Sequence, residues 1–244
     1  MNELRAKGLR DSDKPGSDTR QRGSSTPPKA PAPGTPCSAD ADVREYDIVG
    51  FTTDIRYNDF GDHDPYGIVF ATREDYEAIR AGEKDPEPLV IRANEGECIE
   101  VTLHNELPKT MNGHTDHANV PVNQRWTNSN RLSLHPQLVQ YDVQRSDGTT
   151  PGFNWDQTIG PGDSITYRWY ADRELGTSVL WDMADVRSHR HHGAFGLLIV
   201  EPSGSTWHDP YTGAPITSGA QAVILDPNGK DFREYALAMT DGMY

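Results

Sequence analysis

Short stretches in which apolar and polar residues alternate make up most of the chain after about residue 44. In residues 98–105, for example, Ile99, Val101 and Leu103 alternate with polar side chains. A period of two is typical of a strand with one buried face. The pattern predicts strands at residues 45–52, 67–72, 88–93, 98–105, 130–137, 164–170, 178–183 and 195–201. With this spacing and little helix, the chain is predicted to be all-β, a Greek-key β-sandwich or barrel.

One short helix is predicted at residues 73–81, REDYEAIRA, directly before Gly82. Turns are predicted where Gly, Pro, Asn and Asp gather, as in residues 94–96, 146–148 and 160–163. These residue types favour turns because Gly tolerates positive φ, Pro fixes φ, and Asn and Asp bond to nearby backbone groups.

Three regions differ in composition. Residues 1–42 are rich in Pro, Ser, Gly and charge and have few large apolar side chains, so we predict a disordered arm there. Residues 43–204 form the predicted sandwich domain. Residues 205–244 are predicted to be a linker and the start of a second, similar domain, because residues 233–241 again have a strand pattern. The alternative is that this last strand adds to the edge of the first sheet.

The chain is acidic, with 23 Lys and Arg against 37 Asp and Glu and a net charge of -14. Nucleic acids and anionic membranes attract basic surfaces, so neither is an expected partner. No apolar run approaches the roughly 18 residues of a membrane span. The first residues lack the apolar core of a secretory signal, so the protein is either cytoplasmic or exported by a signal outside this sequence.

Two cysteines are present, Cys37 and Cys98. They form a disulfide if the protein folds in an oxidising compartment, and remain two thiols otherwise. Neither has the CxxC spacing of a metal site.

Three blocks of sequence resemble the N-terminal cupredoxin domain of multicopper oxidases. They are PLVIRANEGECIEVTLHNELP at 88–108, NRLSLHPQLVQYD with the following segment to 182, and HHGAFGLLIVEP at 191–202. The resemblance spans about residues 44–203 and is greatest to long bacterial multidomain members, some related to manganese and iron oxidases. It implies a cupredoxin-like sandwich, copper as cofactor, and oxidation of a metal ion or organic reductant by oxygen. It also implies an extracytoplasmic location and further cupredoxin domains, of this or another chain, as partners.

The copper positions of that family depart from its pattern in this chain. The family carries two His-x-His pairs per copper-bearing domain, because residues i and i+2 of a strand point the same way and two imidazoles can meet at one copper cluster. Here the first pair is His135-Pro136-Gln137 and the second is Trp181-Asp182-Met183. A His-Cys-His motif is absent as well. We therefore expect copper to be supplied mainly outside this chain. The alternative is a non-catalytic structural or interaction module that has lost copper.

The remaining histidines offer one metal-site hypothesis. His135 is proposed to bind an ion together with His189 or His191 of the segment SHRHHG, although Arg190 opposes a cation there and a surface loop is the alternative. The pair His114 and His117 has HxxH spacing, but in a stretch that favours a loop. No catalytic residue is assigned.

Overall fold

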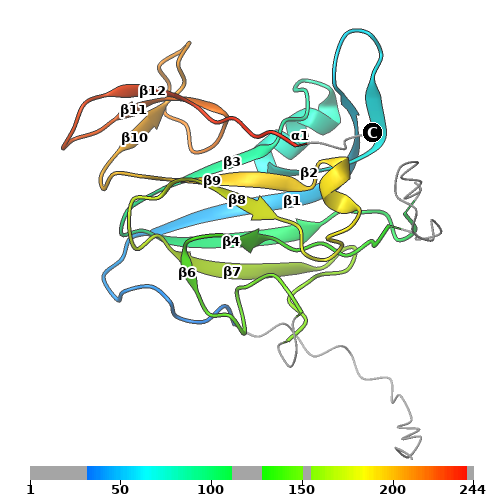
Figure 1. Cartoon of the computed structure of the whole chain (residues 1–244), viewed down its shortest axis with the longest axis horizontal. Coiled ribbons are helices and arrows are strands. Elements are labelled where there is room, and N and C mark those ends of the chain that lie inside the picture. The colour runs from blue at the N-terminus through cyan, green and yellow to red at the C-terminus, as the bar shows by residue number, and fades with distance from the viewer. Residues whose placement is uncertain (1–31, 112–127, 151–154, 241–244) are drawn as a thin grey trace, which may run out of the picture.

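Two curled sheets packed face to face form the body of the protein (Figure 1). The computed structural model describes residues 32–111, 128–150 and 155–240. The larger sheet, sheet A, has the strand order β2-β1-β4-β7-β6, and sheet B has the order β3-β9-β8-β5. The strands of sheet A are β1 (Val43–Arg56), β2 (His63–Thr72), β4 (Cys98–Asn105), β6 (Gln140–Tyr141) and β7 (Ser164–Tyr170). Those of sheet B are β3 (Leu89–Asn94), β5 (His135–Pro136), β8 (Gly176–Trp181) and β9 (Phe195–Glu201).

Both sheets are mixed. Strand β1 is antiparallel to β2 but parallel to β4, and β3 is parallel to β9, which is antiparallel to β8. Consecutive strands such as β3 and β4 lie in different sheets, so the chain crosses from one sheet to the other. The inner faces of the two sheets pack against each other and enclose one core. The predicted all-β sandwich is confirmed.

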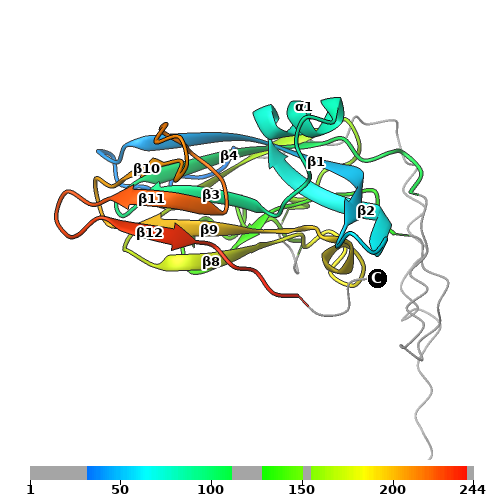
Figure 2. The same ribbon diagram turned by 90° about the horizontal axis from the view of Figure 1, so that it is seen from above.

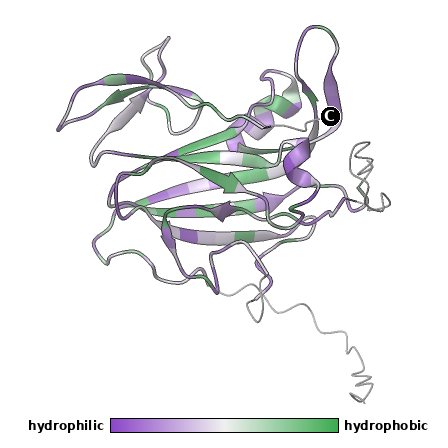
Figure 3. Cartoon of the chain, in the orientation of Figure 1, coloured by the Kyte–Doolittle hydropathy of each residue, from purple (hydrophilic) through white to green (hydrophobic). Residues whose placement is uncertain are grey.

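The core lies between the sheets and follows the alternation seen in the sequence (Figure 3). Ile99, Val101 and Leu103 of β4 are fully buried and pack in one cluster with Tyr167 and Trp169 of β7. The polar positions of the same strands pair on the outer face, for example Thr102 with Thr166 at 2.9 Å. A period-two strand thus contributes its apolar half to the core and its polar half to cross-strand contacts.

Strand β9 is buried at every residue. Leu198 and Val200 face the main core, whereas Leu197 and Ile199 pack on the other side with Val90 and with Ala236 and Ala238 of the C-terminal segment. The uninterrupted apolar run in this strand is typical of a strand covered on both faces. Sheet B therefore has a third layer over it.

That third layer is a small sheet of the strands β10 (Thr206–His208), β11 (Gln221–Leu225) and β12 (Phe232–Tyr235), in antiparallel order (Figure 2). The strand expected at 233–241 is shorter, and it pairs with β11 and not with the edge of the first two sheets. Assignment of residues 205–244 to the start of a second domain remains a prediction.

The helix α1 occupies Arg73–Ala81, as predicted. The Thr72 side chain accepts a hydrogen bond from the Asp75 N–H at the first turn, and Gly82 ends the helix with φ 74°. Thr72 is thus the N-cap and Gly82 the C-cap. Such caps are needed because the first N–H groups and the last carbonyls have no partner inside the helix. In the described part of the chain, no helix is long and apolar enough to cross a membrane.

A disulfide joins Cys37 to Cys98, 61 residues further on, so the first of the two cysteine alternatives is the one observed. Nearby, the Ser146 hydroxyl donates to the Pro33 carbonyl at 2.6 Å and Arg168 donates to the Gly34 carbonyl at 2.9 Å. The last residues of the predicted disordered arm are thus held against sheet A, while residues 1–31 lie outside the described residues. Closing a loop of this length stabilises a fold by about 4 kcal/mol in the chain-entropy treatment.

Candidate functional site

The two copper-pair positions singled out in the sequence lie side by side on sheet B. Strands β5 and β8 pair so that His135 is opposite Trp181 and Pro136 is opposite Leu180. Residues directly opposite each other in an antiparallel pair point to the same face. Leu180 belongs to the main core, so His135 and Trp181 point outward, away from it. The next strand, β9, pairs Phe195 with Trp181, so Phe195 lies on the same face.

His135 is oriented by Asp147. Its Nδ1 lies 2.6 Å from the Asp147 carbonyl oxygen and 3.2 Å from the Asp147 carboxylate. Both are acceptors, so Nδ1 carries the proton and the neutral ring keeps its lone pair on Nε2. Gly148 follows with φ 72°, where an added Cβ would lie 2.4 Å from the Leu134 carbonyl oxygen, so glycine is required for this close approach. The half-buried neighbour Tyr141 has a pKa raised by partial burial and by the charge of Asp147.

The other positions of the two pairs do not complete a copper site. Gln137 is exposed and Met183 is 36% exposed. An amide oxygen and a thioether are poor ligands for Cu(II), and the indole of Trp181 is none. With His135 as the one imidazole among these positions, the residues present do not fit the copper cluster that the resemblance implies. In the described ranges, no three His, Cys, Asp or Glu side chains gather as a metal-binding group.

Asp182 and His189 form a buried ion pair behind this face. His189 Nδ1 lies 3.0 Å from Asp182 Oδ2, and its Nε2 lies 2.8 Å from the Ser129 carbonyl oxygen. Both ring nitrogens face acceptors, so the ring is held doubly protonated. Burial alone lowers the pKa of His189, but the hydrogen bond to Asp182 and its charge outweigh burial and raise the pKa above the ordinary value. While these bonds hold, His189 has no lone pair to offer a metal.

The Asp182 carboxylate organises the backbone around it. Its Oδ1 accepts from the Ser133 N–H at 2.9 Å and its Oδ2 accepts from the Asp185 N–H at 3.0 Å. Ser133 is therefore bonded to a side chain and not to a neighbouring strand. This explains why the strand expected at 130–137 is reduced to the two residues of β5, and why β8 ends at Trp181 instead of 183.

The three histidines of the 3-10 helix η2 (His189–His192) have separate surroundings. His192 Nδ1 lies 2.6 Å from Asp64 Oδ2, which ties the helix to β2. His191 lines an outer pocket of about 440 Å³ together with Trp181, Arg190, Met239 and Thr240. The grouping of His135 with His189 or His191 as metal ligands remains a prediction, and His114 and His117 lie outside the described residues.

Sequence reasoning did not identify the role of Asp182 or the pair of His192 with Asp64. In the sequence, Asp182 was interpreted as one of the residues that stand where the second copper pair belongs. A signal was available for Asp182, because a lone carboxylate at the end of an apolar strand is buried only when it is paired.

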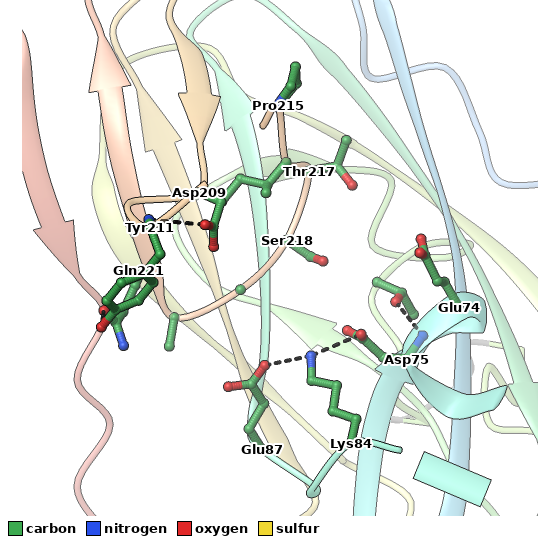
Figure 4. Close-up of a pocket in the computed structure, with 14 residues that line it drawn as sticks. Glu74, Asp75, Lys84, Glu87, Asp209, Tyr211, Pro215, Thr217, Ser218 and Gln221 are labelled. Carbon is green, nitrogen blue, oxygen red and sulfur yellow. Dashed lines mark hydrogen bonds and ion pairs between the residues drawn. The ribbon is translucent and has the colours of Figure 1, made fainter. Parts of the chain in front are cut away.

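A second concave region lies between α1 and the loop that joins β10 to β11 (Figure 4). It encloses about 630 Å³. Lys84 Nζ lies 2.9 Å from Asp75 and 2.8 Å from Glu87, and Asp209 accepts N–H groups of its own loop. Lys84, Asp75 and Glu87 are thus bonded to one another, and we assign this region no ligand.

No protein-family model matches the sequence, and no curated protein matches it. Several solved structures are similar. One is a copper nitrite reductase from Nitrosomonas europaea, with 21% identity over 67% of this chain and 43% of that chain and a TM-score of 0.43. A blue copper oxidase from the same organism has 21% identity over 67% and 40%, with a TM-score of 0.43. A multicopper oxidase from Pseudomonas thermotolerans has 18% identity over 71% and 36%, with a TM-score of 0.45. The chain spans less than half the length of these structures, and such values do not assign it to a family.

Proposed function

We propose that this chain is the N-terminal, cupredoxin-like part of a multicopper oxidase-type oxidoreductase, and that its own copper positions are inactive. The observation that carries the proposal is the pairing of His135 with Trp181. It brings the two copper positions of the sequence resemblance together on one outward face, with one imidazole left among them. Copper is then supplied mainly by further cupredoxin domains, of this chain or another.

The ligands available in this chain support the proposal that copper is supplied by other domains. Nε2 of His135 can offer one lone pair, whereas a trinuclear copper cluster needs several imidazoles from each of two domains. We assign no oxidation step to the residues of this chain. In the whole protein, the substrate class is a metal ion or an organic reductant, with oxygen as the acceptor. The disulfide between Cys37 and Cys98 agrees with an extracytoplasmic location, because disulfides persist in oxidising compartments.

A specific observation favours one alternative, a structural module without any copper role. Where the family's second pair belongs, Asp182 is committed to a buried ion pair with His189. This position stabilises the fold instead of binding a metal.

Copper analysis of the purified 244-residue chain tests the proposal. After incubation with Cu(II) and removal of loosely bound metal, we expect fewer than one copper per chain by mass spectrometry of the metal content. We also expect no turnover of a phenolic substrate. A blue absorbance band, or stoichiometric phenol oxidation by the chain alone, would contradict the proposal.

A further inference from the structure

Arg92 is a fully buried cation at the junction of sheet B and the third layer. It lies on β3, and its Nη1 is 3.0 Å from Glu201 Oε1 on β9 and 2.7 Å from Glu234 Oε1 on β12. Its Nη2 donates to the Gly219 carbonyl at 3.2 Å. One guanidinium nitrogen therefore serves two carboxylates from two different layers.

The cluster has one more carboxylate than cation. Glu201 is 4% exposed at its side chain and Glu234 is 20% exposed, so water screens neither fully. The pKa of Glu201 is raised to about 7: burial is the largest cause, the charge and hydrogen bond of Glu234 and the charge of Glu174 act in the same direction, and Arg92 opposes them. Two close carboxylates of this kind hold a proton in common, because ionising both is unfavourable in a poorly hydrated site.

The contacts beside this cluster attach the third layer to sheet B. The Gly219 N–H donates to the Val90 carbonyl of β3 at 3.0 Å, whereas the Ala236 N–H donates to the Ala220 carbonyl at 2.7 Å within the third layer. Beyond Glu234, Ala236 and Ala238 pack on the apolar outer side of β3 and β9. The C-terminal segment then runs along sheet B to Met239, which lines a pocket with Trp181 (Figure 2).

We propose that the cluster of Arg92, Glu201 and Glu234 is a protonation-dependent latch for the third layer. With a proton between the two carboxylates, a single negative charge faces the guanidinium and β12 is held against sheet B. When both carboxylates are ionised, they repel each other and β12 opens more often. Opening exposes the apolar outer side of sheet B, formed by Val90, Val179, Leu197 and Ile199.

The direction of the pH effect follows from the raised pKa of an acid. The native state binds the proton more tightly than the open state, in which Glu201 has its ordinary pKa near 4.5. The stabilisation is complete below that value and is lost as pH rises through about 7. The latch is therefore tightest in mildly acidic solution and weakest in mildly alkaline solution.

Hydrogen exchange of the 244-residue chain at pH 5.5 and pH 8, corrected for intrinsic exchange rates, tests the latch. We expect protection of the Gly219 amide, which bonds to Val90 of sheet B, to fall on the order of tenfold at the higher pH, since one pKa unit corresponds to a tenfold change. Protection of Val101 and Leu103 in β4 should not change, which separates local opening from global unfolding.

The variant Glu234→Gln removes the excess carboxylate and should reduce this pH dependence, and Glu201→Gln, which removes the group with the raised pKa, should abolish it. The exposed residue Glu83 provides a matched control, Glu83→Gln, which should behave as the parent chain. The latch is refuted if the parent chain shows equal protection at both pH values, or if Glu234→Gln shows the same loss. The protection of β4 in each variant reports whether it has folded.

Discussion

Two buried charge clusters lie at opposite ends of β9 and differ in what surrounds their carboxylates. Before the strand, Asp182 accepts two backbone N–H groups as well as the proton of His189. At its last residue, Glu201 shares one guanidinium nitrogen with Glu234. Backbone donors keep a carboxylate ionised inside a protein, whereas crowded carboxylates keep a proton. The first cluster therefore pairs one carboxylate with one imidazole and two backbone donors, whereas the second holds one carboxylate more than its cation can offset.

The largest expected effect is on the first cluster. Replacing His189 with Leu leaves the buried Asp182 charge without its partner, and we expect a loss of about 3 to 5 kcal/mol in the free energy of unfolding. Urea unfolding followed by tryptophan fluorescence measures it. The double variant His189→Leu, Asp182→Leu should lose less, because it removes both charges. A single variant within about 0.5 kcal/mol of the parent chain would show that this pair is not a structural ion pair.

The next effect concerns the second cluster. Since the stabilisation from Glu201 is lost between pH 4.5 and about 7, the free energy of unfolding should fall across that range. Allowing for partial hydration of the cluster, we expect a fall of about 1 to 3 kcal/mol. Urea unfolding at a series of pH values measures this fall. In Glu234→Gln, the free energy of unfolding should fall less across the same range. A fall of the same size in Glu234→Gln would remove the distinction between the two clusters.

A smaller effect is expected at Asp64, whose Oδ2 accepts the proton of His192 at 2.6 Å and whose Oδ1 accepts the Tyr66 N–H. Asp64→Asn keeps the shape but weakens a charge-assisted hydrogen bond, at a cost of about 1 to 2 kcal/mol. Thermal unfolding measures this. If Asp64→Asn lowered the free energy of unfolding as much as His189→Leu, the expected order of the two effects would be wrong.

The smallest effect on stability is expected from Gln137→His, because Gln137 is exposed and such substitutions stay within about 0.5 kcal/mol. Its effect on copper is the informative one. A second imidazole two residues from His135 should raise the affinity for Cu(II), measured by calorimetry. His135→Ala in the same background should remove the gain. If Gln137→His gains no affinity, the structural-module alternative is favoured.

Much of the fold was predictable because it depends on local pattern. The helix at 73–81 follows from the Thr72 cap and Gly82, and the strand at 98–105 follows from its alternation. The strand at 130–137 was predicted too long, because the Asp182 side chain, distant in sequence, takes the Ser133 N–H. The short strands β6 and β10 gave no periodic signal, since two or three residues are too few to show one.

The candidate site was predictable in part. The sequence resemblance marked His135 and Trp181 as copper-pair positions, and only the structure showed that they are paired across β5 and β8. The different surroundings of His189, His191 and His192 were not predictable. A histidine-rich segment shows which side chains are present but not which group each one contacts.

The sequence by itself determined the all-β architecture, the acidic surface and the incomplete copper pattern, since each of these is a property of composition or short-range order. Only the tertiary structure decided the partners of the buried charges and cysteines. Cys37 meets Cys98 across 61 residues, Arg92 meets Glu201 across 109 and Asp64 meets His192 across 128. The physical reason is that a buried charge needs a partner at about 3 Å, and strand register, not position in the chain, sets which one is available.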